Sequence, residues 1–250
     1  MKILVPVKQV PDPNAIRFDA SGNFAASTPR VVNEYDQYAI EEAIRLKEAG
    51  KAAEVVVMTV GAVAARDAVN RGLAMGADRG LLVNASDSDL TAVTVASIIA
   101  AEAKSGGYDL ILVGQESSDG GSGNVGPQVA GMLDLPLVSN VVQLEAGDGV
   151  LTLGREVEDG RHIVEAPLPG VVCALRGLNE PRSPSLKGIM AARKKPVEEK
   201  SIGDYDTPGA HVSWGGLYAE ERVVEGTIIE TDAESAAKQV VELLREKKVI

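Results

Sequence analysis

Cysteine and histidine are nearly absent from the sequence. The one cysteine, Cys173, excludes an internal disulfide bond and a CxxC metal site. It lies in the apolar run GVVCAL, so we expect a buried and unreactive thiol. Of the two histidines, His162 lies in an alternating strand pattern and His211 in a loop pattern, and neither has an evident serine or cysteine partner. The sequence therefore shows no constellation for nucleophilic catalysis.

Long apolar runs and an excess of positive charge are also missing. The apolar run that follows Lys2 has only the length of a strand, which is too short for a signal-peptide core or a membrane span. The formal net charge of -11 disfavours contact with nucleic acid or anionic lipid. We therefore expect a cytoplasmic protein that neither binds nucleic acid nor inserts directly into a membrane.

The first half of the chain alternates between two periodic patterns. Apolar, β-branched runs predict buried strands, and between them lie segments with helical spacing of apolar residues. The predicted strands are 2–7, 54–60, 79–83 and 109–114, and the predicted helices are 36–49, 64–75 and 90–104. Strands that are separated by helices of this length pair in parallel with right-handed crossovers. The pattern predicts an α/β fold with a doubly wound, mostly parallel sheet of the adenine-nucleotide-binding type.

The pattern changes after Pro136. Four short strand patterns between 137 and 176, separated by turn signals such as AGDG and EDGR, predict added β-hairpins. A polar segment rich in proline, serine and glycine follows, with a short helix pattern at 186–195, and an amphipathic helix is predicted at 232–247. We expect a main domain over 1–195 and an extended C-terminal arm over 196–250.

One segment has a composition that is typical of a ligand-binding loop. It is the glycine-rich stretch GQESSDGGSGNVG after the strand that ends at Val113. Its glycines allow the backbone to approach a ligand closely, and the helix predicted at 124–133 directs free amides toward an anion. In a parallel sheet, ligands bind at the carboxyl ends of the strands. A nucleotide lying across the loops after the first, second and fourth predicted strands is the simplest use of this arrangement, although a flexible glycine turn has the same composition.

Five motifs resemble the electron-transfer flavoprotein β subunit, in the same order and with family-like spacing. They are VKQVPD near the N-terminus, LAMGADRG at 73–80, the glycine loop, REVEDG in a hairpin, and LNEPRSPSLKGIMAARKK at 178–195. Together they span nearly the whole chain, and the last motif is long and has no generic structural reason to recur.

The resemblance implies a non-catalytic subunit of a heterodimer. In that family the α subunit holds FAD and the β subunit holds AMP. The pair carries electrons from flavin dehydrogenases, such as acyl-CoA dehydrogenases, to a membrane quinone oxidoreductase. The arm over 196–250 would then pack partly on the α subunit.

The resemblance also implies site residues. The AMP contacts would fall on Pro6, Asn33, Glu34, Tyr35, Asp36, Val60, Gly114, Gln115, Glu116, Ser117, Ser118, Asp119, Gly120, Gly121, Ser122, Gly123, Asn124 and Val125. A docking segment for the dehydrogenase would have Leu186 as its anchor, with Pro184, Ser185, Ile189 and Met190 around it.

Several alternatives remain. The stretches DGGSGNVGP and NEYDQYA resemble family members that carry a second FAD in place of AMP and split electron pairs between two acceptors. A stress-protein-like adenine nucleotide binder would account for 1–135 but not for the later motifs. A nucleotide hydrolase would need a metal-binding carboxylate and a base near Gly114, for which Asp119 and Glu116 are candidates.

Overall fold

A computed structural model describes residues 1–86, 90–209, 212, 219 and 226–250. It has two compact units, Met1–Leu217 and Tyr218–Ile250, which are described separately.

The first unit is built on a nine-stranded sheet in the order β11-β5-β4-β1-β6-β10-β7-β8-β9. The pairings from β11 to β7 are parallel, whereas β7, β8 and β9 form an antiparallel meander. The strands are β1 (Lys2–Pro6), β4 (Glu54–Gly61), β5 (Arg79–Asn84), β6 (Leu110–Gly114), β7 (Leu137–Ala146), β8 (Val150–Val157), β9 (Gly160–Pro167), β10 (Gly170–Ala174) and β11 (Val197–Ser201). A separate antiparallel ribbon pairs β2 (Gln9–Pro11) with β3 (Arg30–Val32).

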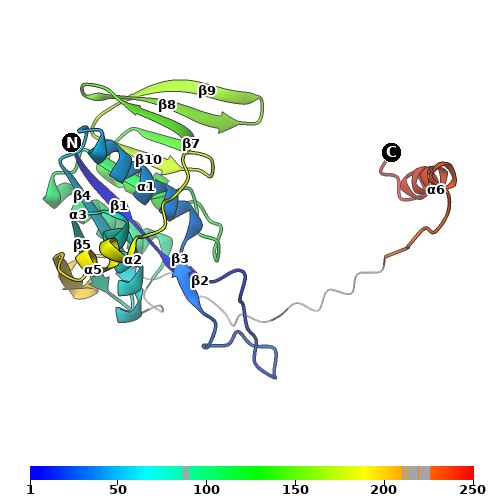
Figure 1. Ribbon diagram of the computed structural model, residues 1–250, viewed down its shortest axis with the longest axis horizontal. Coiled ribbons are helices and arrows are strands. Elements are labelled where there is room, and N and C mark those ends of the chain that lie inside the picture. Colours follow the sequence, from blue (N-terminus) through cyan, green and yellow to red (C-terminus); the bar gives the residue numbers. More distant parts are fainter. Residues whose placement is uncertain (87–89, 210–211, 213–218, 220–225) are drawn as a thin grey trace. The chain divides into compact units, whose positions relative to one another are not determined.

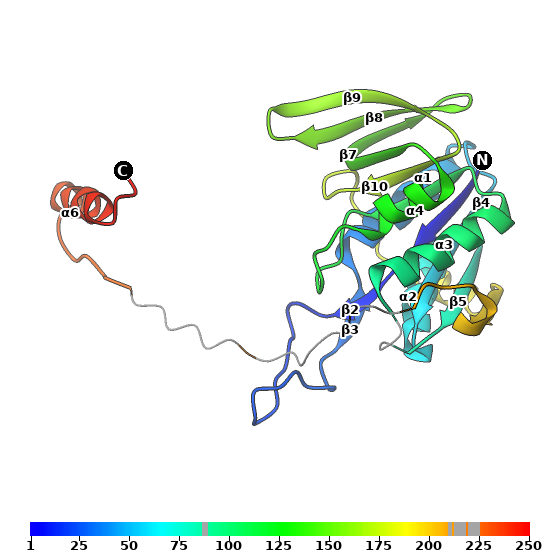
Figure 2. The ribbon, with the colours of Figure 1, turned by 180° about the vertical axis from the view of Figure 1, so that it is seen from behind.

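Helices cover both faces of the parallel part of the sheet. On one face lie α1 (Glu34–Glu48) and α2 (Arg66–Met75), with α5 (Leu186–Ala192) against α2 (Figure 1). On the other face lie α3 (Ala92–Gly106) and α4 (Val125–Leu133) (Figure 2). Alternate strand residues enter two apolar clusters: Ile3 and Val5 pack with α1 and α2, whereas Leu4 packs with α3 and α4. The predicted doubly wound fold is confirmed.

The predicted hairpins are confirmed for β7, β8 and β9 but not for the fourth strand pattern. β10 lies between β6 and β7 and is parallel to both. The physical reason is its burial, because all five of its residues are buried and such a strand needs cover on both faces. The same burial encloses Cys173, whose pKa is raised to about 12 by desolvation, as expected for an unreactive thiol.

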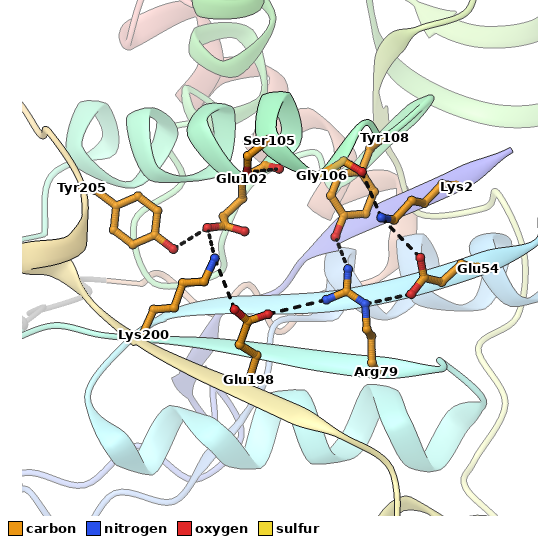
Figure 3. A network of polar contacts seen from close by, with 10 residues as sticks. All are labelled: Lys2, Glu54, Arg79, Glu102, Ser105, Gly106, Tyr108, Glu198, Lys200 and Tyr205. Atoms are coloured by element: carbon orange, nitrogen blue, oxygen red, sulfur yellow. Dashed lines mark hydrogen bonds and ion pairs between the residues drawn. The ribbon is translucent and has the colours of Figure 1, made fainter.

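The first residues of the predicted C-terminal arm, 196–250, belong to the main sheet. Strand β11 pairs in parallel with β5, so the chain leaves the sheet only after Ser201. Polar contacts hold this strand in place, as Figure 3 shows. The Lys200 ammonium and the Tyr205 hydroxyl each lie 2.6 Å from one oxygen of Glu102 on α3, and Arg79 on β5 reaches Glu198 at 3.9 Å.

The second unit contains α6 (Ala233–Glu246). Asp232 caps this helix by accepting hydrogen bonds from the amides of Glu234 and Ser235. None of its residues is buried, and an apolar face that includes Val240 and Val241 is exposed. Among the helices that the structure describes in the two units, none is long and apolar enough to cross a membrane.

Candidate functional site

A cavity of about 220 Å³ opens at the carboxyl ends of the central parallel strands. Three walls come from the ends of β1, β4 and β6 with the loops that follow them, and a fourth comes from the start of α3. The strand ends that the sequence analysis selected therefore meet at one cavity. The lining residues are Pro6, Val7, Lys8, Asn33, Asp36, Met58, Thr59, Val60, Leu90, Thr91, Ala92, Val95, Ile99, Val113, Gly114, Gln115, Glu116, Ser117, Gly120, Ser122, Gly123, Asn124, Val125 and Gly126.

The glycine loop, residues 114–124, forms the polar wall of this cavity. Gly121 and Gly123 have φ angles of 59° and 58°, a left-handed conformation that glycine adopts without steric cost. The loop leads into α4, where the N-cap residue Asn124 makes no side-chain capping bond. The amides of the first helical turn thus lack the partner that an N-cap side chain usually supplies. This wall is suited to an anion.

Two side chains from other segments, Asn33 before α1 and Lys8 after β1, hold the glycine loop. The Asn33 side-chain nitrogen donates to the Glu116 carbonyl at 2.8 Å, and its oxygen accepts from the Ser118 amide at 3.1 Å. The Lys8 ammonium lies 2.7 Å from an Asp119 oxygen. The loop is therefore tied to the segment after β1 and to the residue before α1.

Asp36 lies beneath these contacts. Its carboxylate accepts hydrogen bonds from the Lys8 amide at 2.7 Å and from the Asn33 side chain at 3.1 Å. Burial raises the pKa of Asp36 to about 7, against the opposite effect of these hydrogen bonds. A Cβ atom at Gly114 would lie 2.2 Å from an Asp36 oxygen, so glycine is required there for close packing of α1 on β6.

The cavity lining also has an apolar part, called the apolar end below. It consists of Val60 and Met58 from β4 and of Leu90, Val95 and Ile99 at the start of α3. The sequence analysis missed the α3 residues. The signal was present, because α3 follows β5 and the carboxyl end of β5 lies at the same edge of the sheet.

Most of the predicted cofactor contacts line the cavity, but five do not. Ser118 and Asp119 take part only through their bonds to Asn33 and Lys8. Gly121 donates its amide to the Ser117 carbonyl at 2.8 Å and shapes the loop. Glu34 accepts from the Tyr38 hydroxyl at 3.2 Å. The five residues outside the lining are Glu34, Tyr35, Ser118, Asp119 and Gly121.

The predicted docking segment forms α5 and presents apolar side chains to solvent. Leu186 is 76% exposed, Met190 61% and Ile189 43%. Ser185 caps the helix by accepting from the Gly188 amide at 3.0 Å, and Pro184 precedes it. A Cβ at Gly188 would lie 2.4 Å from the Ala74 carbonyl, so α5 packs closely on α2.

The loop before α5 is clamped to α1. The Arg182 guanidinium bonds both oxygens of Glu41, at 2.8 and 2.9 Å, and both oxygens of Glu48, at 2.6 and 2.9 Å. These bonds, first those to Glu48, raise the pKa of Arg182. Asn179 donates to the Tyr38 carbonyl at 3.0 Å. The motif LNEPRSP is thus a structural support for α5.

The basic run after α5 divides between two roles. The Lys195 ammonium donates to the Leu73 and Ala77 carbonyls at 2.9 and 2.5 Å. These carbonyls lie at the C-terminal end of α2, where a positive charge is stabilising because it opposes the helix dipole. Burial lowers the pKa of Lys195. Arg193 and Lys194 are exposed and form no ion pair among the described residues.

A nucleotide hydrolase would need acidic residues at the cavity that could hold a metal ion or activate water. In the described part of the chain, no group of three or more histidine, cysteine, aspartate or glutamate side chains is placed to hold a metal ion. Asp119, one of the two candidates for that chemistry, is paired with Lys8.

Comparisons with known proteins agree with the motifs. The family model described as "Electron transfer flavoprotein domain" matches residues 22–204. The electron transfer flavoprotein subunit beta of Bradyrhizobium diazoefficiens is 40% identical over 82% of this chain and 83% of the relative. The subunit of the same name from Syntrophomonas wolfei is 43% identical over 79% and 78%. The caffeyl-CoA reductase-Etf complex subunit CarD of Acetobacterium woodii is 32% identical over the full length of both chains.

Neither the family match nor these relatives is confined to the glycine loop. The family match also covers α1 to α5, the hairpins and the predicted docking segment. The chain therefore belongs to the electron transfer flavoprotein β-subunit family, whose members are electron-carrier subunits rather than enzymes and work with an α subunit.

Proposed function

We propose that this chain binds AMP in the cavity and pairs with an α subunit that holds FAD. The heterodimer carries electrons from flavin dehydrogenases, such as acyl-CoA dehydrogenases, to a quinone oxidoreductase. The observation that carries the AMP assignment is that the lining of one cavity combines a glycine-rich loop with aliphatic side chains.

The polar wall suits a phosphate that is bound mainly by backbone amides. Among the described lining residues, Lys8 is the one cation, and its ammonium is already paired with Asp119. Asp36 and Glu116 also line the cavity and would repel an anion. Amides of the loop at Gly123 and of the first turn of α4 are then the main source of favourable contacts for phosphate oxygens.

The apolar end suits a planar base. Met58, Val60 and Leu90 offer aliphatic surface, and the Thr91 side chain caps α3 by accepting from the Thr94 amide. Burial of an adenine ring against such surface is favourable because apolar area is removed from water.

A second candidate is a β subunit that binds FAD in place of AMP and takes part in electron bifurcation. Full-length similarity to CarD, a subunit of a caffeyl-CoA reductase-Etf complex, favours this candidate. FAD contains the AMP unit, so the polar wall and the apolar end would bind the same part of either ligand. The number of flavins in the heterodimer separates the two proposals.

The test is co-expression with the α subunit, purification of the heterodimer, and extraction and quantification of both cofactors. We expect one FAD and one AMP per heterodimer. Two FAD molecules and no AMP would replace the first candidate with the second. A heterodimer that contained FAD in the α subunit but no nucleotide in this chain would contradict both assignments.

We also propose that part of the C-terminal arm, including α6, packs on the α subunit. Among the described residues of its own unit, nothing covers the exposed apolar face of α6, and a helix of this kind normally buries that face. The double substitution Val240→Ser and Leu244→Ser should weaken heterodimer affinity about tenfold or more, since buried apolar anchors dominate interface energy. The dissociation constant measured by calorimetry checks this.

Glu242→Ser is the matched control, because Glu242 lies on the polar side of the same helix. It should leave heterodimer affinity unchanged. Both variants should unfold at the wild-type temperature when this chain is heated alone. Equal loss of stability and affinity in the double variant would place α6 in the core of this subunit instead.

A further inference from the structure

Asn33 stands at the N-cap of α1 but does not cap it. An asparagine at this position normally accepts a hydrogen bond from an amide in the first turn of its own helix. Here the side chain forms no such bond. Its oxygen accepts instead from the Ser118 amide, 3.1 Å away in the glycine loop.

Both donor hydrogens of the Asn33 side chain also form hydrogen bonds within the protein. An asparagine amide has two donor hydrogens, and the Asn33 nitrogen donates to the Glu116 carbonyl at 2.8 Å and to an Asp36 oxygen at 3.1 Å. The residue is 1% exposed. No side-chain hydrogen is left for a ligand, although the residue borders the cavity.

The bonds of Asn33 fix residues 116–118, the first part of the glycine loop that forms the polar wall. Glu116 and Ser118 flank Ser117, and the Ser117 carbonyl accepts from the Gly121 amide at 2.8 Å. Gly121 and Gly123 then hold the left-handed conformations that lead into α4. The Lys8 contact to Asp119 is a weaker support, since an ion pair with a half-exposed lysine contributes little.

We propose that Asn33 is a positioning residue that sets the glycine loop in its anion-binding conformation. It determines affinity for the phosphate group of the bound nucleotide and not affinity for the base. This inference rests on the proposed nucleotide site, and it assigns Asn33 a role through the loop instead of a direct contact with the ligand.

The test compares AMP with adenosine, which lacks the phosphate. The variant Asn33→Ser keeps a good N-cap residue for α1, but its side chain is too short to bridge to the loop. In a heterodimer freed of nucleotide by dialysis, calorimetry should show AMP affinity reduced about tenfold or more, in line with the loss of two or more buried hydrogen bonds. Adenosine affinity should stay within about twofold of wild type.

Two further variants complete the experiment. Asn33→Asp keeps an acceptor for the Ser118 amide but loses both donors, so we expect it to bind AMP as weakly as Asn33→Ser. Gln37→Ala removes an amide from the same end of α1, whose one side-chain hydrogen bond among the described residues goes to the Val32 carbonyl at 3.5 Å, and should bind both ligands normally.

Equal losses for AMP and adenosine in Asn33→Ser would overturn the positioning role, and so would unchanged AMP affinity. A wild-type protein that bound neither ligand would overturn the nucleotide assignment itself, and this inference with it. The three patterns differ, so failure of the proposed function is distinguishable from failure of this inference.

Discussion

Replacing Gly123 with valine is expected to abolish nucleotide retention by the heterodimer while leaving the fold intact. Gly123 has a φ of 58°, and a residue with a Cβ pays about 1–2 kcal/mol in this conformation, a β-branched residue more. A Cβ there would meet the Gln115 carbonyl at an ordinary 3.5 Å, so local crowding is not the cause. The loop should instead change its backbone conformation and turn its amides away from the phosphate. Quantification of AMP in the purified heterodimer checks this.

Two substitutions separate this effect from a general loss of stability. Gly149 has a φ of 78° in the turn between β7 and β8, and a Cβ there would meet no atom within 4 Å. Gly149→Val therefore introduces similar strain away from the cavity and should retain AMP. Gly123→Asn should also retain most of the AMP, because asparagine tolerates the left-handed region. Full AMP occupancy in Gly123→Val would rule out the proposed role of the loop conformation.

The central strands were predictable because they are buried on both faces. In the run KILVP the four residues after Lys2 are apolar and all are buried, which is typical of a strand covered on both faces. The position of the cavity could then be predicted, because the carboxyl ends of parallel strands lie at one edge of the sheet and the loops that follow them meet there. The sequence therefore predicted three of the four walls of the site.

The edge strand β11 could not be predicted in the same way. Its sequence, VEEKS, has one apolar residue, and the strand is held by Glu198 and Lys200 through partners on β5 and α3. Such polar pairs depend on residues that are far apart in the chain, and no local pattern reveals them. The same holds for Asn33, whose partners Glu116 and Ser118 lie in the loop after β6. Only the family resemblance included Asn33 among the site residues, and its contacts with the loop became visible only in the structure.

Replacing Leu186 with alanine is expected to weaken docking of the flavin dehydrogenase without changing either cofactor. Leu186 is 76% exposed at the first position of α5, and Ser185 and the Arg182 clamp hold this helix in place before any partner binds. A preformed anchor of this kind loses little conformational entropy on binding. Its truncation should cost about 1–3 kcal/mol, which corresponds to a loss of roughly 5-fold to 150-fold in affinity.

The measurement is stopped-flow reduction of the heterodimer by its dehydrogenase over a concentration series. With Leu186→Ala we expect slower reduction at low dehydrogenase concentration and wild-type rates at saturation, because electron transfer within the docked complex does not involve this side chain. Val63→Ala is the matched control, since Val63 is also well exposed, at 62%, but lies outside α5. FAD absorbance and AMP content should be normal in both variants, because the cavity lining includes neither residue. Wild-type reduction rates for Leu186→Ala at every concentration would remove α5 as the docking segment, whereas equal slowing in both variants would indicate a broad apolar surface instead of a single anchor.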